Sequence, residues 1–395
     1  MTETSSDKPT LVVDQAIPYI EELFSQVAEV VAVSAVDIDR DLVAEADADA
    51  LAIRSVTKVD ETLVTGAGLR WLGTATIGQD HIDHDLLDRN NIKFCSAPGS
   101  NALAVVQYVM SAISYWRQLN GRSIEQLTVA IVGYGEIGRR LYQLLSAIGI
   151  NCLISDPPLC DQGKLSQSIT LNELAQHCDV LTLHVPYTKS GPHATHHIIN
   201  SSILEVLPSS SLLINSARGP LIDETALVKW LEKGGDAILD VWPSEPNISS
   251  ILTKLILLGT PHIAGYSLEG KFNATMALYH SFVKEFYPLE YSRLTAAIRL
   301  PPNLSDKQSI VNPSGMTDFF LKSYSISQDA IVDRSKSLID KAAKDYREFV
   351  RKRNNYSFRR DYSGQSVDLQ SLSKSERSLI ISLLNQQLFA QEDDD

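Results

Sequence analysis

The apolar residues of this chain gather in short runs, and amphipathic stretches separate the runs. Short apolar runs rich in β-branched residues are typical of buried strands, whereas apolar positions three or four residues apart predict helices. In the first part of the chain, strands are expected at 11–14, 30–33, 50–53, 71–74 and 93–95, and helices at about 18–27, 38–46 and 82–90. Because strands and helices alternate, this part predicts a small parallel sheet.

A long helix and a second series of strands follow. Asn101 is expected to cap a helix that runs to about Leu119. Further strands are expected at 129–132, 152–155, 180–185, 211–215, 237–241 and 255–258. A helix over 224–233 is expected to end at two glycines. The second series therefore predicts another doubly wound sheet, in which ligands bind beyond the carboxyl ends of the strands.

Three glycines follow the strand at 129–132 at G-x-G-x-x-G spacing: Gly133, Gly135 and Gly138. The first permits a tight turn, the second lets a diphosphate approach the backbone, and the third allows close helix–strand packing. Asp156 lies eighteen residues past Gly138 (156 − 138), at the end of the next strand. A carboxylate there accepts hydrogen bonds from a ribose and repels a 2′-phosphate. The stretch predicts an NAD site; the alternative is a glycine turn without a ligand.

Composition limits the classes of protein that need to be considered. With 395 residues and 44% hydrophobic content, the chain can bury a large core, and its length predicts two or three domains. The net charge of −13 argues against nucleic-acid and anionic-membrane partners. The polar residues 1–10 lack the apolar core of a signal peptide, and the four cysteines have no metal-ligand or disulfide spacing. We expect a cytoplasmic protein without a metal.

The residue composition of the chain changes after about residue 300. Pro301 and Pro302 indicate a linker or an irregular entry. Residues 334–360 contain ten Lys or Arg against three Asp or Glu. A solvated basic helix is the ordinary interpretation of such a run, and a dimer surface or a phosphate contact are the alternatives. The acidic residues 391–395 are expected to form a disordered tail.

Three segments that directly follow expected strands contain Arg218, Glu245 and His262. Together these residues supply the groups that oxidation of a 2-hydroxy acid requires. An arginine binds the carboxylate through two parallel bonds, a histidine takes the hydroxyl proton, and a carboxylate orients the histidine and stabilises its protonated form. Taken singly, each has an ordinary explanation as a turn, surface or packing residue, and sequence spacing does not show that they converge.

The same segments resemble the D-2-hydroxyacid dehydrogenase family, through motifs at 215–223, 240–246 and 261–265. One branch of that family, which oxidises 4-phosphoerythronate to 2-oxo-3-hydroxy-4-phosphobutanoate in vitamin B6 biosynthesis, matches at 54–59, 73–81, 97–102, 156–158 and 262–271. The stretch 262–271 is the most specific, because the wider family continues differently after the His-Ile pair. The likeness covers about 11–290 and is faint beyond.

The resemblance implies an α/β fold with three parts. These are a flavodoxin-like substrate-binding domain (1–108 and 266–298), a Rossmann NAD-binding domain (109–265) and a C-terminal α+β dimerisation domain (299–395). The first two are doubly wound parallel-sheet domains with the site in their cleft, and the third implies a homodimer.

The resemblance also implies roles for single residues. The catalytic residues would be Arg218, Glu245 and His262, and no metal is implied. Contacts with NAD would come from Gly133, Gly135, Gly138, Asp156, Ser216, Ala217, Arg218, Asp240 and Gly265. The substrate, a small phosphorylated 2-hydroxy acid, would contact Ser55, Thr76 and Tyr266. Arg54, next to Ser55, is a candidate cation for its phosphate, and Gln107 departs from the Glu that many relatives carry.

Two other functions remain open from the sequence. One is a different D-2-hydroxyacid dehydrogenase, such as a phosphoglycerate-type enzyme, because the catalytic trio is common to the family. The other is an NAD-sensing, corepressor-like binding protein. The stretch 262–271 argues against the first, and the net charge of −13 argues against the second.

Overall fold

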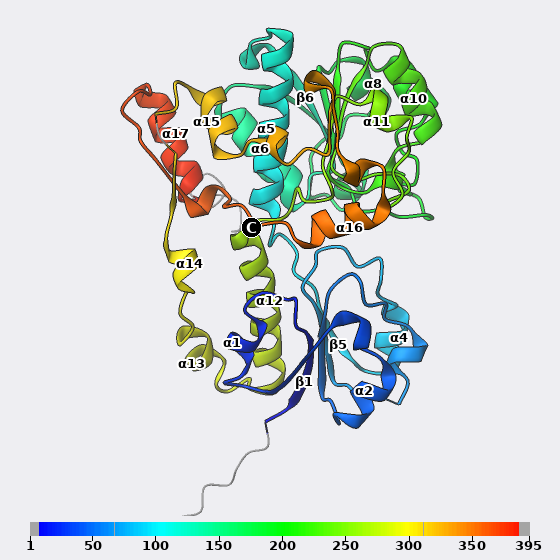
Figure 1. Ribbon diagram of the computed structural model, residues 1–395, viewed down its shortest axis with the longest axis vertical. Coiled ribbons are helices and arrows are strands. Elements are labelled where there is room, and N and C mark those ends of the chain that lie inside the picture. Colours follow the sequence, from blue (N-terminus) through cyan, green and yellow to red (C-terminus); the bar gives the residue numbers. More distant parts are fainter. Residues whose placement is uncertain (1–7, 67, 311, 387–395) are drawn as a thin grey trace, which may run out of the picture. The chain divides into compact units, whose positions relative to one another are not determined.

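The computed structural model describes residues 8–66, 68–310 and 312–386, so the predicted acidic tail at 391–395 lies outside the described residues. The chain forms two compact units (Figure 1). Unit 1 comprises the described residues of Met1–Asn101 together with Leu268–Ser305, and unit 2 comprises those of Ala102–Ser267 and Asp306–Asp395. None of the helices in the described ranges combines the length and apolar character that a bilayer-spanning segment needs.

Unit 1 is built on a five-stranded parallel sheet in the order β2-β1-β3-β4-β5. This is the flavodoxin-like order, in which the chain reverses direction across the sheet beside its first strand. The strands are β1 (Thr10–Asp14), β2 (Glu29–Val33), β3 (Ala50–Ile53), β4 (Trp71–Thr74) and β5 (Lys93–Cys95). All five strands predicted from the apolar runs are confirmed.

Helices cover both faces of this sheet, and the helix after the second unit's last parallel strand returns to complete it. The helices are α1 (Ile20–Phe24), α2 (Arg40–Glu45), α3 (Glu61–Val64), α4 (His84–Arg89), α12 (Leu268–Phe286), α13 (Tyr291–Ala296) and α14 (Pro302–Ser305). Helices α1 and α12 lie on one face, where Trp71 packs edge-on against Phe282, and α2 and α4 lie on the other (Figure 1). The sequence missed α3, because four residues are too few to show a helical period.

Unit 2 contains an eight-stranded sheet in the order β14-β13-β11-β10-β9-β8-β6-β7. Strands β6 to β11 are all parallel, and β13 and β14 are added antiparallel. The chain switches direction between β6 and β8, which is where doubly wound sheets bind ligands. The strands are β6 (Thr128–Val132), β7 (Asn151–Ser155), β8 (Val180–Leu183), β9 (Leu212–Asn215), β10 (Asp236–Leu239), β11 (Leu258–Gly259), β13 (Val332–Asp333) and β14 (Leu338–Ile339).

The helices of unit 2 pack on both faces of this sheet, with α5 and α6 on one face and α8 and α10 on the other (Figure 1). They are α5 (Ala102–Asn120), α6 (Glu136–Ala147), α7 (Pro157–Asp161), α8 (Leu171–Gln176), α9 (Ser201–Val206), α10 (Glu224–Glu232), α11 (Leu252–Leu255), α15 (Met316–Ser323), α16 (Tyr346–Asn354) and α17 (Lys374–Leu384), with a small parallel pair β12 (Gln308–Ile310) and β15 (Gln365–Val367).

Two local predictions need correction. Asn101 is not a side-chain cap, because its Oδ1 accepts no hydrogen bond from any described residue. The strand predicted at 255–258 is limited to β11, since α11 extends through Leu255. Apolar residues are buried in α11, in β11 and between them. Hydropathy alone therefore does not distinguish a short helix from a strand here.

The described residues from Asp306 onward form one compact unit with Ala102–Ser267, and a C-terminal dimerisation domain over 299–395 stays a prediction. Strand β13 pairs with β11 and so covers the open edge of the parallel sheet. Phe319, Phe320 and Tyr362 are fully buried in the same core cluster as α5. Since α5 is apolar around its circumference over most of its length, it requires this additional cover.

We expect Phe319→Ala to lower the free energy of unfolding of unit 2 by about 3–5 kcal/mol, because it removes a fully buried ring and leaves a cavity. Denaturant unfolding followed by circular dichroism measures this. Ile381→Ala on α17 is the matched control: its side chain is 42% exposed, and it should cost less than about 1 kcal/mol. Equal costs in the two variants would contradict a shared core.

Candidate active site

The glycine loop connects β6 to α6 at the switch point of the unit 2 sheet. Gly133 has a φ of 95°, and a Cβ there would lie 2.6 Å from the carbonyl oxygen of His184. A Cβ on Gly138 would lie 1.9 Å from the carbonyl oxygen of Gly133. Gly135 precedes the first turn of α6, and a Cβ there would meet no atom within 4 Å. The first and third glycines are thus required by the turn and its packing, and the second leaves open space.

Asp156 directly follows β7 and connects two backbone segments through its carboxylate. Its Oδ2 accepts a hydrogen bond from the Tyr134 N–H of the glycine loop at 2.7 Å, and its Oδ1 accepts one from Leu159 at 3.1 Å. The second bond caps α7, whose first residues are two prolines. A carboxylate oxygen accepts more than one hydrogen bond, so each oxygen retains capacity for a ribose hydroxyl.

These residues fit an NAD molecule. The open position at Gly135 lies at the N-terminus of α6, where backbone N–H groups and the helix dipole favour a diphosphate. Ser216, after β9, has a buried Oγ without a hydrogen-bond partner among the described residues. The strands that carry these groups end at the same edge of the sheet. A dinucleotide would supply the missing partners.

Arg218 is presented by a turn that Asn215 organises at the end of β9. The Asn215 side chain donates to the carbonyl of Arg218 at 2.8 Å and accepts from the Ala217 N–H at 3.1 Å. The next residue, Gly219, has to be a glycine, because a Cβ there would lie 1.9 Å from the carbonyl oxygen of Trp242. The tight approach links the Arg218 turn directly to the loop after β10.

Asp240, after β10, organises the loop that carries His262. Its carboxylate is 1% exposed and accepts hydrogen bonds from Thr260 Oγ1 at 2.6 Å and from the Ile263 and Ala264 N–H groups at 2.7 and 2.8 Å. The His262 N–H donates to the Asp240 carbonyl at 2.9 Å. These bonds hold His262 at a φ of 58°, a left-handed conformation that is costly for a residue other than glycine. The implied contact of Asp240 with NAD stays a prediction.

His262 and Glu245 form a close pair. His262 Nδ1 and Glu245 Oε1 are 2.6 Å apart, and the two side chains are 23% and 25% exposed. Burial alone would raise the pKa of Glu245, but the charge and hydrogen bond of His262, helped by the charge of Arg353, lower that pKa below its usual value of 4.5. Because an ionised carboxylate only accepts, Nδ1 is the donor and Nε2 is left to exchange a proton.

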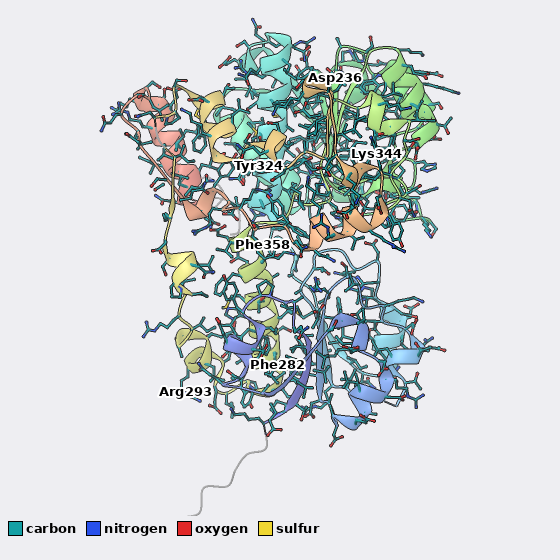
Figure 2. All side chains as sticks on the ribbon, in the orientation of Figure 1. Asp236, Phe282, Arg293, Tyr324, Lys344 and Phe358 are labelled. Atoms are coloured by element: carbon teal, nitrogen blue, oxygen red, sulfur yellow. The ribbon has the colours of Figure 1, made fainter. Side chains whose placement is uncertain are left out.

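The C-terminal segment supports this loop through contacts that no motif in the sequence indicates. Arg359 donates to the carbonyls of Ile263, Ala264 and Tyr266, and to Gln107 Oε1 and the Ala104 carbonyl of α5. Its guanidinium carbon also lies 4.1 Å from the ring centroid of Tyr324, which is labelled in Figure 2. Gln107, the departure from the family pattern, is thus a neutral partner for Arg359.

Tyr266 and Ser267 are held by the same segment. Arg353 Nε donates to Tyr266 Oη at 3.1 Å, and Ser267 Oγ donates to Asp361 Oδ2 at 3.0 Å. Phe358, labelled in Figure 2, has its ring centroid 6.0 Å from that of Tyr266. In the sequence, Arg353 belongs to the excess of positive charge over 334–360, and Tyr266 and Ser267 lie in the motif at 262–271.

The substrate residues expected in unit 1 lie after neighbouring strands of its sheet. Arg54 and Ser55 follow β3, and Thr76 follows β4 and donates through Oγ1 to the Gly78 carbonyl at 2.9 Å. Arg54 Nε bonds to Asp14 Oδ2 at 2.6 Å, and the Asp14 side chain is fully buried at the end of β1. The expected residues therefore share the carboxyl edge of the sheet, where ligands of such folds bind.

Comparisons with known proteins find sequence relatives of this chain. The family described as D-isomer specific 2-hydroxyacid dehydrogenase, NAD binding domain, matches residues 106–264. Erythronate-4-phosphate dehydrogenase of Escherichia coli O81 (strain ED1a) is 45% identical over 277 residues, which are 69% of this chain and 72% of that protein.

Solved structures give the same fold. NAD⁺-bound 3-phosphoglycerate dehydrogenase of Entamoeba histolytica is 25% identical with a TM-score of 0.59, covering 71% of this chain and 95% of that chain. A 2-hydroxyacid dehydrogenase from Ketogulonicigenium vulgare Y25 is 21% identical with a TM-score of 0.61, covering 71% and 96%. The second likeness concerns the fold alone.

We expect Asp156→Ala to narrow the preference for NAD over NADP, because it removes the anion that repels a 2′-phosphate. The ratio of kcat/KM for the two cofactors measures this. Asp156→Asn retains an acceptor for the cap of α7 and separates charge from local folding, and Asp161→Ala at the end of α7 is the control. Equal efficiency of wild-type protein with both cofactors would contradict the assignment.

We expect the stabilising effect of the Glu245 carboxylate to disappear in acid. Its pKa is lower in the folded chain than its usual 4.5, so the contribution is complete above about pH 5 and declines as the pH falls below 4.5. Urea unfolding of wild type and Glu245→Gln between pH 7 and pH 4 should show a difference in unfolding free energy that shrinks on acidification. Glu232→Gln at the exposed end of α10 controls for loss of a charge. A difference independent of pH would contradict the prediction.

Proposed function

The chain belongs to the D-isomer specific 2-hydroxyacid dehydrogenase family, and we propose that it oxidises 4-phospho-D-erythronate to 2-oxo-3-hydroxy-4-phosphobutanoate in vitamin B6 biosynthesis. As a member of this family it is an NAD-dependent oxidoreductase. The observation that carries the proposed reaction is the His262–Glu245 pair, held in the same unit as the dinucleotide loop and the Arg218 turn. The choice of substrate is supported by the 45% identity to erythronate-4-phosphate dehydrogenase.

In the proposed mechanism each residue has one task. The Arg218 guanidinium binds the substrate carboxylate through two parallel charge-assisted bonds and polarises the neighbouring C2 oxygen. His262 Nε2 takes the proton of the C2 hydroxyl, and Glu245 stabilises the imidazolium that forms. When bound, NAD⁺ supplies the acceptor for the hydride that leaves C2, so the alcohol becomes a ketone and the two electrons leave with the hydride. The reverse direction returns the proton from Nε2.

The remaining contacts are proposed from the family likeness. Ser55, Thr76 and Tyr266 bind the substrate, and Arg54 is a candidate cation for its phosphate. The position of the first two beyond strand ends, and of Tyr266 four residues after His262, supports this assignment. The charge of Arg54 is already partly compensated by the carboxylate of Asp14. A second cation could therefore also contribute to binding the substrate phosphate.

We also propose a cytoplasmic homodimer in which the segment 306–395 contributes to subunit contacts. The family likeness supports this assembly. Residues 334–360 carry an excess of positive charge, whereas the whole chain has a net charge of −13. The basic segment of one subunit could therefore form ion pairs with acidic residues of the other. The same net charge disfavours nucleic-acid and membrane partners.

We expect the purified protein with NAD to form NADH from 4-phospho-D-erythronate at higher kcat/KM than from 3-phosphoglycerate, D-lactate or erythronate. Absorbance at the NADH band follows the reaction. His262→Ala should lower kcat by on the order of 10² to 10⁴, because it removes a positioned acid–base group, and NAD should still bind. His280→Ala, on α12, is the matched control. NAD binding without turnover of any acid would favour the sensor function instead.

A further inference from the structure

The basic segment around α16 contains cations of two kinds. Some already have partners: Arg351 pairs with Glu348 at 2.6 Å, Lys352 pairs with Asp340 at 3.1 Å, and Arg359 donates to backbone carbonyls and to Gln107. Arg353 forms no ion pair with a carboxylate among the residues that the structure describes. It lies at the C-terminal end of α16 and is half-buried.

Arg353 lies beside the catalytic groups. Its Nε donates to Tyr266 Oη at 3.1 Å, and its guanidinium carbon lies 5.9 Å from the centre of the Tyr266 ring. Its two terminal nitrogens have no hydrogen-bond acceptor within 8–66, 68–310 and 312–386. The nearby acid, Glu245, is already paired with His262. These two donor groups are not fully buried, so solvent reaches them and an anionic group of a ligand can replace that water.

We propose that Arg353 binds the phosphate group of the substrate, so that α16 makes the enzyme specific for phosphorylated 2-hydroxy acids. The two terminal nitrogens form a planar fork that matches two phosphate oxygens, a geometry that lysine does not reproduce. Tyr266 keeps the fork in place by accepting from Nε, and Arg353 is close enough to Glu245, the partner of His262, for its charge to lower the pKa of that carboxyl. The proposal rests on the proposed function and adds to it the residue that selects the substrate class.

Arg353 differs from Arg54 in its local charge balance. Arg54 is bonded at 2.6 Å to the fully buried carboxylate of Asp14, so much of its charge is compensated before a ligand binds. Arg353 has a hydroxyl, not a carboxylate, on its Nε. A phosphate dianion therefore gains more from Arg353 than from Arg54, since the attraction is not shared with an acid that is already bonded.

The test compares 4-phospho-D-erythronate with erythronate, the same acid without the phosphate, in wild type, Arg353→Ala, Arg353→Lys and Arg351→Ala. Arg353→Ala should raise KM for the phosphorylated acid by on the order of 10- to 100-fold, because two charge-assisted bonds are lost. KM for erythronate should change less than about threefold. Arg353→Lys should recover part of the loss, and Arg351→Ala, whose cation is paired on its own helix, should resemble wild type.

Inorganic phosphate is the second probe. In the presence of NAD it should inhibit wild type competitively against the phosphorylated acid, and Arg353→Ala should weaken this inhibition by a similar factor. An equal change in KM for both acids, or unchanged inhibition by phosphate, would overturn the proposal and leave Arg353 with only the task of positioning Tyr266.

The failure of the proposed function would be recognised separately. If the proposed function is wrong, the wild-type protein does not turn over 4-phospho-D-erythronate. Calorimetric titration of inorganic phosphate into wild type and Arg353→Ala, both saturated with NAD, then decides the present proposal. Equal affinities would overturn it, and a loss in the variant alone would support it.

Discussion

The buried carboxylate of Asp240 is the constraint on which the active site depends. A carboxylate that is 1% exposed is stable only if its oxygens are satisfied, and Thr260, Ile263 and Ala264 supply the donors. Those donors all come from the loop after β11, so burial of one acid determines the path of the loop. The path places His262 in a left-handed conformation, and it is from there that Nδ1 reaches Glu245. The backbone strain at His262 is thus offset by hydrogen bonds of its neighbours.

The same loop is held from its other side by the C-terminal segment. Burying the Arg359 guanidinium carries a large desolvation cost, which is offset because every one of its nitrogens has an acceptor on α5 or on residues 263–266. The bond between Ser267 and Asp361 continues this support to the residue where unit 2 passes into α12. The C-terminal segment therefore supports residues 263–267, which directly follow His262.

The charges of the site are arranged by task. Glu245 is kept ionised beside His262, the proposed acid–base group, and Arg218, on the turn after β9, is the proposed ligand of the substrate carboxylate. The dinucleotide loop lies at the edge of the same sheet, at its switch point. With Arg353 as the proposed ligand of the phosphate and Arg218 as that of the carboxylate, unit 2 would offer a cation to each charged group of a phosphorylated 2-hydroxy acid. The dinucleotide loop and the proposed proton-transfer pair thus follow strands of the same sheet, which orients them relative to one another.

The sequence by itself determined most of what is local. Apolar runs located the strands at 50–53, 71–74 and 93–95, and glycine spacing with Asp156 located the turn and the acid of the dinucleotide motif. These two kinds of prediction succeed because the burial of a strand and the backbone freedom of a glycine depend on near neighbours in the chain. Only the tertiary structure brought Glu245 within 2.6 Å of His262 and placed Arg353, Arg359 and Asp361 around residues 263–267. Such pairings join positions far apart in the chain, and no local pattern encodes them, because a charged side chain looks the same in sequence whether it is solvated or buried against a carbonyl.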